Sequence, residues 1–580
     1  MSQPSTPHFP SIRLARSEVF PQDKSARGSE LYCEISDWTN PITFFVGRNG
    51  AGKSRTARAV SRRIPGGRFL ETDRLVTMMS FSHYSWGVHP KEDFKGIPLG
   101  DSDRQQMKSV TANVHSASDE LYTMREQPDI WIKVVSFLKR ALGRTIQLRE
   151  SSGFLDPYVQ IENIEYSLFR DEGHGLRELV ILLAAAYRDD WSLLVVDEPE
   201  LHLHPSMARL WLGELRRECI ERDKRAIIVT HEPSLLRMRD AEDLKSVWHF
   251  QANSSPRRFF QDIHEGNQSA ANERYLTRAS ATLKTNPDIV SQLVFSPRPV
   301  LVEGVHDVAA LSATLDRTQP AEVVTQTDLV FCGGSAEVAL WFEIADSMGI
   351  DVRAIADLDA CLENSVQRVM DSRDEVTRKY REELFQEPPR TSEILKPLIA
   401  EMTKLGVPKS PKERANWLAQ SVPEGTAHYA RKQKLLEIWR ENGLWLHPQG
   451  TIENVLGIET KGINNASEAA SNPGEIDAVA SWCAYDLNPS GDIELLLNLA
   501  VERVAHAIME AIGASPGSKF YAPVGPSALA DGRLVDVVPK EGEFHRIVVK
   551  TPKPFQGYWL EFSRETPSSQ LKLNPPNDSP

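Results

Sequence analysis

One glycine-rich segment has the residue types and the spacing that phosphate binding needs. It fits the pattern G-x-x-x-x-G-K-[ST] over residues 47–54. The glycines let backbone N–H groups turn toward a phosphate, the lysine reaches the β- and γ-phosphates, and the serine offers a hydroxyl to Mg²⁺. The pattern predicts a nucleoside triphosphate site, with ATP as its cofactor, formed by Gly47, Asn49, Gly50, Gly52, Lys53 and Ser54.

Two acids that follow a later apolar run, residues 193–196, are placed to complete this site. Asp197 would hold the Mg²⁺ shell together with Ser54, and Glu198 would polarise the attacking water. His231, at the end of the next apolar run, would sense the γ-phosphate. The alternative is that these residues are ordinary strand ends that cap helices or face solvent.

His202 and His204 could form a metal pair with His231 as a third ligand. Their alternation in a strand or turn more simply places both imidazoles on one face near the start of a helix. We favour this second interpretation, which needs no metal.

Four acids follow two separate apolar runs in the second half of the chain, as Glu303-Gly304-x-x-Asp307 and Asp357-x-Asp359. Because parallel strands end at one edge of a sheet, these carboxylates can share a pocket, where they repel one another unless divalent cations neutralise them. Such hard oxygen ligands suit Mg²⁺ or Mn²⁺, and not zinc. Two such ions can activate a water and stabilise the leaving oxygen of a phosphodiester. The alternative is a set of helix N-caps and solvated strand ends, a role for which Asp307 is well placed.

Both sets of residues need a parallel sheet to position them, and the hydrophobic pattern predicts one in each half. Strands are expected at 31–35, 41–46, 68–70, 159–168, 193–197 and 226–231, with helices at 55–64, 121–142, 180–187 and 205–222. A second series of strands is expected at 299–304, 327–331, 352–356 and 444–447, with helices at 307–315 and 336–348. Alternating strands and helices predict an α/β fold with mainly parallel sheets. Residues 362–442, charged and broken by prolines, are expected to be a helical insertion, and residues 494–512 an amphipathic helix.

The overall composition limits the class of protein. A chain of 580 residues is too long for one hydrophobic core, so we expect at least two domains. Its net charge of −13 argues against coating nucleic acid by bulk electrostatics but leaves room for a local basic groove. Its five scattered cysteines indicate neither a disulfide framework nor a zinc site. No signal peptide or membrane-length apolar run is evident, so we expect a cytoplasmic protein without a membrane partner.

The motifs of the first half resemble the ABC-type ATPase heads of the overcoming-lysogenization-defect (OLD) family and its SMC-like relatives. The resemblance rests on residues 47–54, on the segment 193–205 and on Thr230-His231. It implies ATP hydrolysis between two subunits, each giving a signature segment to the nucleotide of the other. Residues 172–178 are placed like that segment but lack its usual Ser-Gly-Gly core, and no glutamine for the loop that completes the Mg²⁺ shell is evident.

The acids of the second half, with Gly333-Gly334 between them, resemble a Toprim domain, the metal-dependent fold of topoisomerases, primases and OLD-family nucleases. The resemblance implies Glu303 and Asp357 as catalytic residues. It further implies a metal site formed by Glu303, Asp307, Asp357, Asp359 and, as a later acid that such nucleases carry, Glu453. A lysine often completes such sites, and the candidates here are Lys461, Lys540 and Lys550.

The expected organisation follows the OLD family in its order, a P-loop ATPase and then a Toprim domain. The expected parts are an entry segment at 1–28, the ABC-type ATPase domain at 29–265, a linker at 266–296, the Rossmann-like Toprim domain at 297–563 and a disordered tail at 564–580. The resemblance implies an ATP-associated, Mg²⁺- or Mn²⁺-dependent nuclease that cuts nucleic acid, with DNA favoured over RNA. It further implies a homodimer or higher homo-oligomer that acts in anti-phage defence, with or without a companion protein.

Two other interpretations remain open. In one, an SMC-like ATPase acts as a sensor and the Toprim domain cuts RNA such as tRNA; residues 451–454 and the helical insertion suit this version equally well. In the other, the protein is a DNA-repair or partner-binding ATPase with an inactive Toprim fold, against which the intact acids argue. A primase would need a zinc ribbon, and a topoisomerase a longer chain for its strand-passage gate.

Overall fold

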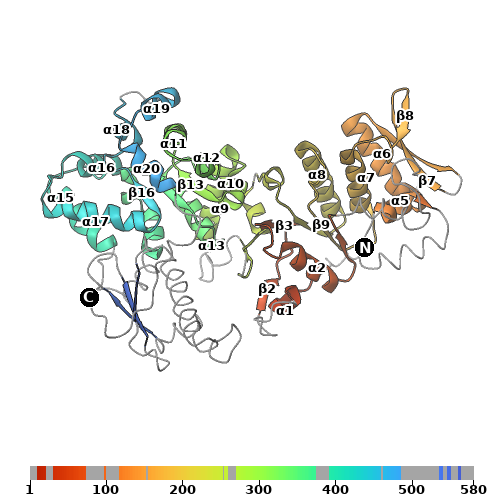
Figure 1. Cartoon of the computed structure of the whole chain (residues 1–580), viewed down its shortest axis with the longest axis horizontal. Helices are drawn as coiled ribbons and strands as arrows, with labels where there is room; N and C mark the ends of the chain where they lie inside the picture. Colours follow the sequence, from red (N-terminus) through yellow and green to blue (C-terminus); the bar gives the residue numbers. More distant parts are fainter. Residues whose placement is uncertain are drawn as a thin grey trace. The chain divides into compact units, whose positions relative to one another are not determined.

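A computed structural model describes residues 9–20, 31–72, 97–98, 117–151, 154–238, 240–251, 254–258, 269–373, 391–458, 462–484, 535–539, 545–549 and 559–562. The chain divides into two units, one of residues 1–296 with 343–351 and one of residues 297–342 with 352–580 (Figure 1). No helix among the described residues combines the length and the apolar character needed to cross a membrane.

The first unit is built on a six-stranded sheet with the order β12-β11-β3-β10-β9-β4. All neighbouring strands are parallel except β11 and β12. The strands are β3 (Ile42–Gly47), β4 (Gly67–Leu70), β9 (Leu193–Asp197), β10 (Arg225–Val229), β11 (Val247–Phe250) and β12 (Arg257–Arg258). Strands β3 and β9 are buried along their whole length, which explains their unbroken apolar sequences.

Helices cover this sheet and form a layer of their own. Helix α2 (Lys53–Arg63) follows β3 directly, and α7 (His174–Tyr187) and α8 (Pro205–Glu221) lie side by side (Figure 1). Helix α7 is buried from Leu176 to its end because α5 (Ala117–Glu126), α6 (Pro128–Leu142) and α8 all pack against it. This all-round burial explains the apolar sequence of α7, which shows no polar face.

Two expected elements differ from those in the structure. The helix expected over 121–142 is two helices, α5 and α6, because Pro128 has no N–H to continue a helix and instead occupies the first turn of α6. The strand expected over 159–168 is a hairpin of β7 (Phe154–Ile161) and β8 (Ile164–Ser167), with Glu162 in the turn at a φ of 48°. Strand β7 pairs further with β5 (Ile97–Pro98) and β6 (Thr145–Ser151), and the separate ribbon β1 (Ile12–Ala15) pairs with β2 (Leu31–Ile35).

The second unit contains a four-stranded, fully parallel sheet with the order β14-β13-β15-β16. Its strands are β13 (Arg298–Val302), β14 (Thr327–Phe331), β15 (Arg353–Ala356) and β16 (Leu444–Leu446). The strands lie where the sequence predicts them, and with the first sheet they confirm the α/β fold with parallel sheets.

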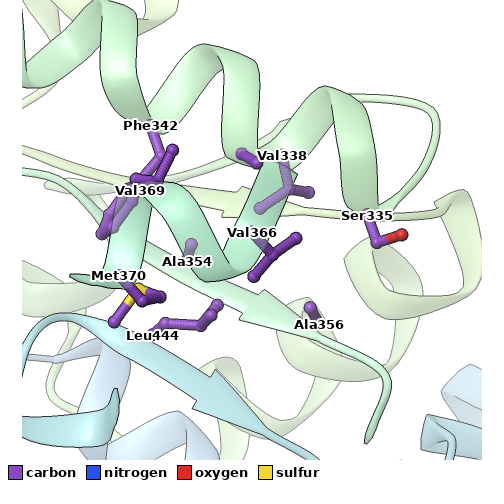
Figure 2. A pocket seen from close by; sticks show the side chains of 10 residues that line it. Ser335, Val338, Phe342, Ala354, Ala356, Val366, Val369, Met370 and Leu444 are labelled. Atoms are coloured by element: carbon purple, nitrogen blue, oxygen red, sulfur yellow. The ribbon is translucent and has the colours of Figure 1, made fainter. Parts of the chain in front are cut away.

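Alternate residues of these strands pack into two different layers. On one face Val300, Val302, Ile355 and Trp445 pack against α11 (Val305–Thr318), α19 (Ile463–Ala470) and α20 (Ile476–Cys483). On the other face, Ala354, Ala356 and Leu444 meet α13 (Ser335–Ser347) and the helical residues 364–373 around a small apolar pocket (Figure 2). Nine of the ten residues that line that pocket are apolar, and Ser335 is the tenth, so the pocket belongs to the core.

Between β15 and β16 the chain leaves the sheet and forms the expected helical insertion. It includes α15 (Thr391–Lys404), α16 (Pro411–Gln420) and α17 (Ala427–Glu441). Three antiparallel strands near the C-terminus were not predicted: β17 (Val535–Pro539), β18 (His545–Val549) and β19 (Trp559–Phe562). The helix predicted at 494–512, the tail at 564–580 and the three candidate lysines all lie outside the described residues.

Candidate active sites

The glycine-rich loop joins β3 to α2 as the motif requires. Gly47 has a φ of 132°, and a Cβ atom there would lie 2.0 Å from the main-chain oxygen of Phe250 on the neighbouring strand β11. Only glycine fits this position, because both the dihedral angle and the close approach of β11 exclude a side chain. The loop is therefore packed firmly against the sheet before any ligand arrives.

Lys53 occupies the first turn of α2 and is 5% exposed. Its Nζ donates hydrogen bonds to the carbonyl oxygens of Gly47, at 2.8 Å, and Arg48, at 3.0 Å. Burial lowers the pKa of Lys53 to about 8, although the nearby acids Glu198, Asp197 and Glu200 oppose that shift. A buried ammonium satisfied only by loop carbonyls is well prepared to exchange them for phosphate oxygens.

Ser54 and Asp197 meet across the two halves of the predicted site. The Ser54 hydroxyl donates to Oδ1 of Asp197 at 3.0 Å. The following residue, Glu198, has a φ of 47°, and its amide donates to the Val229 oxygen at the end of β10. A non-glycine residue in this conformation is held there by its surroundings, as is common in active sites.

His231 lies close to Glu198, as the predicted γ-phosphate site requires. Its Nε2 is 3.7 Å from Oε1 of Glu198, and burial, followed by the charge of Lys53, lowers the pKa of His231. Glu200 fixes this histidine: its Oε1 accepts hydrogen bonds from the Thr230 hydroxyl and the His231 amide, both at 2.8 Å. Sequence reasoning gave Glu200 no role, although its place two residues after Glu198 could have suggested one.

The segment that resembles a signature motif is held by its own domain. Glu172 accepts from Arg144 at 2.8 Å and from the Tyr166 hydroxyl, while Arg177 donates to the main-chain oxygens of Leu168 and Glu172. At the start of α7, Gly173 and His174 are exposed. The charged side chains of this segment thus serve local structure, and its glycine and histidine face outward.

The two histidines considered as a metal pair have separate roles in the structure. His204 is the N-cap of α8, where its Nδ1 accepts from the Ser206 amide at 3.3 Å. The His202 ring lies against that of His174, with centroids 5.0 Å apart. In the described part of the chain, these rings belong to no group of three or more side chains that could hold a metal ion.

In the second unit, Glu303 and Asp357 directly follow the parallel strands β13 and β15. Oε1 of Glu303 accepts a hydrogen bond from the Asp357 amide at 3.0 Å. Burial, together with the charges of Asp357, Asp359 and Asp307, raises the pKa of Glu303 to about 8, although the hydrogen bond from the Asp357 amide opposes the shift. Burial likewise raises the pKa of Asp357 to about 7, with Asp307, Asp359 and Glu453 adding to the effect and His447 opposing it. The sheet edge thus gathers the predicted carboxylates within electrostatic reach of one another.

The other predicted metal ligands come from elements near Glu303 and Asp357, and they differ in how far they are buried. Asp307, buried near the start of α11, accepts from the Gly304 amide at 2.9 Å, so one of its oxygens is a helix cap as the alternative proposed. Asp359 lies in the 3₁₀ turn η3 (Leu358–Leu362). Glu453, buried in α18 (Ile452–Leu456), has its Oε1 3.7 Å from Nδ1 of His306.

This donor set fits a divalent cation in its chemistry. Burial first, and then the neighbouring acids, raise the pKa values of Glu303 and Asp357, so a bound cation would favour their charged forms. Carboxylate oxygens suit Mg²⁺ or Mn²⁺. Within the described ranges, no three His, Cys, Asp or Glu side chains are yet close enough to enclose an ion. Binding would therefore require these side chains to draw together.

Sequence reasoning missed two histidines at this edge. His447 directly follows β16, just as Asp357 follows β15, and its position at a strand end could have marked it. His306, beside Asp307, lay within a motif read only for its acids.

Next to Glu453 there is also a cleft of about 440 Å³ lined by Ala419, Gln420, Gln449, Glu453, Asn454, Gly457 and Ile458.

Comparison with known proteins finds two matching families. Residues 158–237 match the family described as "AAA domain, putative AbiEii toxin, Type IV TA system". Residues 294–359 match "Overcoming lysogenization defect protein-like, TOPRIM domain", a range that contains Glu303, Asp307, Asp357 and Asp359.

Two curated relatives align with the chain. The OLD nuclease of Thermus scotoductus is 27% identical over 268 residues, which are 43% of this chain and 47% of that protein. Protein ea59 of Escherichia phage lambda is 26% identical over 245 residues, 34% of this chain and 46% of that protein. The chain thus spans about half the length of these relatives. A crystal structure of Stu0660 of Streptococcus thermophilus aligns with 44% of this chain and 83% of that chain at 11% identity, with a TM-score of only 0.21.

Proposed function

Because this chain has the architecture of the OLD family, an AAA domain followed by an OLD-like Toprim domain, we propose that it is an ATP-hydrolysing, metal-dependent nuclease. The contact that carries the nuclease assignment is the one between Glu303 and the Asp357 amide at 3.0 Å. It brings together two residues at the edge of a parallel sheet whose carboxyl pKa values are raised, to about 8 for Glu303 and to about 7 for Asp357. A carboxyl group that titrates near neutral pH is suited to proton transfer.

In the Toprim domain, Glu303 would act as general acid/base, and Asp307, Asp357, Asp359 and Glu453 would hold Mg²⁺ or Mn²⁺. When bound, the cation would lower the pKa of a water and stabilise charge on the phosphodiester oxygens. The side chains themselves bind, orient and move protons: Glu303 is fixed through Oε1, so its other oxygen remains available for a proton.

In the AAA domain, Lys53 would leave the carbonyls of Gly47 and Arg48 for phosphate oxygens, and Ser54 and Asp197 would hold Mg²⁺. Glu198 would orient the attacking water, with His231 beside it, held by Glu200. Gly47, Asn49, Gly50 and Gly52 would turn backbone N–H groups to the phosphates.

The nucleic acid substrate would enter the cleft beside Glu453. Its other lining groups are uncharged, including the side-chain amides of Gln420, Gln449 and Asn454. Amides donate to and accept from bases and sugars without attracting phosphate strongly. This cleft is suited to a nucleoside next to the cut, and we favour DNA as the substrate.

The active form is proposed to be a homodimer or a higher homo-oligomer. Gly173 and His174 are exposed at the N-terminal end of α7. In a dimer they could face the nucleotide of a second copy, where a helix N-terminus favours an anion. The five cysteines are all free and buried, which fits our placement of the protein in the reducing cytoplasm.

We place the biological role in defence against phage, with the trigger or companion protein unassigned. One relative comes from a phage and the other from a bacterium. A plaque assay with the expressed protein directly tests whether it protects the cell against phage or assists the phage. Loss of protection in Glu303→Gln would tie defence to the nuclease.

The biochemical test is cleavage of plasmid DNA and of total RNA, with Mg²⁺ or Mn²⁺ and with or without ATP. We expect DNA to be cut by the wild type and not by Glu303→Gln, whereas Asp328→Asn, an exposed acid on β14, should cut normally. RNA cleavage alone would instead support the sensor–effector interpretation. Normal ATPase activity with no cleavage of either substrate would contradict the nuclease assignment.

A further inference from the structure

The second unit holds a buried histidine, His447, whose side chain makes no hydrogen bond. His447 follows β16, and its amide donates to the main-chain oxygen of Ala356 at 3.2 Å. Since Ala356 immediately precedes Asp357, the histidine and that acid lie at the same edge of adjacent parallel strands. The backbone therefore delivers an imidazole to the place where Glu303 and Asp357 meet.

The side chain of His447 is fully buried, at 0% exposed, and neither ring nitrogen has a hydrogen-bond partner. A buried imidazole normally bonds through both nitrogens, because desolvation without replacement bonds costs free energy. Its nearest acidic group is Asp307, whose Oδ1 lies 3.9 Å from Nε2. That distance is too long for a hydrogen bond.

The same distance fits two atoms that bind one cation. Ligands of an octahedral ion at about 2.1 Å stand roughly 3.0 Å apart when adjacent and roughly 4.2 Å apart when opposite. At 3.9 Å, Nε2 of His447 and Oδ1 of Asp307 fall within this range. An ion between them would also provide a partner for Nε2, one of the two unpartnered ring nitrogens.

We propose that His447 is a nitrogen ligand of the cation at this edge, so that the site binds Mn²⁺, or a similar divalent transition metal, in preference to Mg²⁺. Mg²⁺ selects oxygen ligands and holds them in a strict octahedron. Imidazole strengthens the binding of divalent transition metals and does little for Mg²⁺. The gain is smaller for Mn²⁺ than for the heavier metals of the same row. The inference rests on the proposed metal-dependent nuclease and adds the choice of metal.

His306 provides a matched control within the same site. Its Nδ1 is 3.7 Å from Glu453, but its side chain is 27% exposed and water can satisfy it. The two histidines thus sit beside the same group of acids, and only His447 lacks any other partner for its nitrogens among the described residues. Replacing each by glutamine removes an imidazole of the same size from a different side of the site.

The experiment is metal binding by the full chain, without nucleic acid or turnover. Titration calorimetry gives the affinities for Mn²⁺ and Mg²⁺, and pulsed electron paramagnetic resonance of bound Mn²⁺ detects hyperfine coupling to an imidazole nitrogen. We expect this coupling in the wild type and in His306→Gln, and its loss in His447→Gln. The His447→Gln affinity for Mn²⁺ should fall by about tenfold or more, with that for Mg²⁺ nearly unchanged.

The outcomes separate this inference from the proposed function. Binding of Mn²⁺ without nitrogen coupling in the wild type, or an unchanged Mn²⁺ to Mg²⁺ preference in His447→Gln, would overturn the ligand role of His447 alone. Failure of the wild type to bind either ion would overturn the metal site itself. The wild-type spectrum decides the question even if His447→Gln does not fold.

Discussion

The main-chain amide of Asp357 donates a hydrogen bond to Oε1 of Glu303 at 3.0 Å, across neighbouring strands and 54 residues of sequence. The bond fixes the orientation of Glu303 through the backbone, and no cationic side chain among the described residues contributes to the pKa of this carboxyl. Burial and the adjacent acids therefore raise its pKa to about 8. A fixed carboxyl that no cationic side chain pairs with distinguishes a site prepared for a cation from a structural ion pair.

This arrangement predicts a pH-dependent stability for the metal-free protein. The pKa of Glu303 rises from its ordinary value of 4.5 to about 8 on folding, so the folded state holds a proton that the unfolded state releases. The associated stability is fully present below about 4.5 and is lost as the pH rises through about 8. In EDTA, the free energy of unfolding of the wild type should fall between pH 5 and pH 8.5. The decrease over this pH range should be smaller in Glu303→Gln by on the order of 1–3 kcal/mol.

Urea denaturation of both proteins across this pH range checks that prediction. Adding Mn²⁺ or Mg²⁺ at pH 8.5 should restore stability to the wild type, because the cation compensates the carboxylates, and should have a smaller effect on the variant. Parallel pH profiles for the two proteins in EDTA would show that Glu303 does not titrate in this range.

A second prediction concerns the strained residue Glu198. Glu198→Gln should bind ATP nearly as tightly as the wild type but hydrolyse it on the order of 10²-fold more slowly, because the amide cannot polarise the attacking water. Nucleotide binding followed by fluorescence and phosphate release measured separately will test both halves. A variant with unimpaired turnover would remove Glu198 from the mechanism, and Glu232→Gln, an acid nearby that caps the η1 turn (Pro233–Leu236), provides the comparison.

The sequence was most informative where short patterns dictate local geometry. The P-loop spacing requires a strand, a turn and a helix, and β3, residues 47–52 and α2 have this order. The acids at 303 and 357 could be paired because each ends an apolar run and parallel strands end together. Side-chain partners could not be predicted in this way. The link from Glu200 to His231 depends on the register of β9 and β10, and the isolation of His447 depends on packing that no motif records.

The sequence was least informative about where a predicted helix or strand is interrupted. The break between α5 and α6 depends on one proline, and the hairpin of β7 and β8 on a two-residue turn, whereas hydrophobic periodicity runs across both. Strands β17 to β19 form an antiparallel sheet whose short apolar runs lie among polar residues, so no pattern over a longer window marked them.

Gly47 provides a third prediction. Gly47→Ala should abolish nucleotide binding or prevent folding, since its Cβ atom would lie 2.0 Å from the Phe250 oxygen at a φ of 132°. Gly213→Ala is the matched control: it lies exposed within α8 with no atom within 4 Å of the added carbon. That substitution should stabilise the protein by roughly 0.5–1 kcal/mol through helix propensity. Circular dichroism with ATP binding checks both, and normal ATP affinity in Gly47→Ala would contradict the close packing of β3 and β11.

A fourth prediction tests the buried ion pair between β4 and α5. Arg68 pairs with Glu120, with side chains 5% and 0% exposed, and Arg188 lies 3.5 Å from the same carboxylate. Glu120→Gln should destabilise the first unit by about 3 kcal/mol, because it removes the buried carboxylate that lies between two guanidinium groups. Glu34→Gln, which breaks a pair with Arg13 on the surface, should hardly change the thermal midpoint. Equal effects of the two changes would contradict the buried network.

The last prediction concerns the cleft beside Glu453. Ala419, at the end of α16, is one of the residues that line it, and Ala419→Trp would fill much of its roughly 440 Å³ with an indole ring. We expect nuclease activity to fall by at least tenfold through a higher KM for the nucleic acid, while ATP hydrolysis and Mn²⁺ affinity stay as in the wild type. Glu413→Trp places the same ring on an exposed turn of α16 outside the cleft and should cut normally. Cleavage by Ala419→Trp at the wild-type rate would show that the substrate reaches Glu303 by another path, whereas loss of Mn²⁺ binding would show that the indole disturbs the acids and not the substrate.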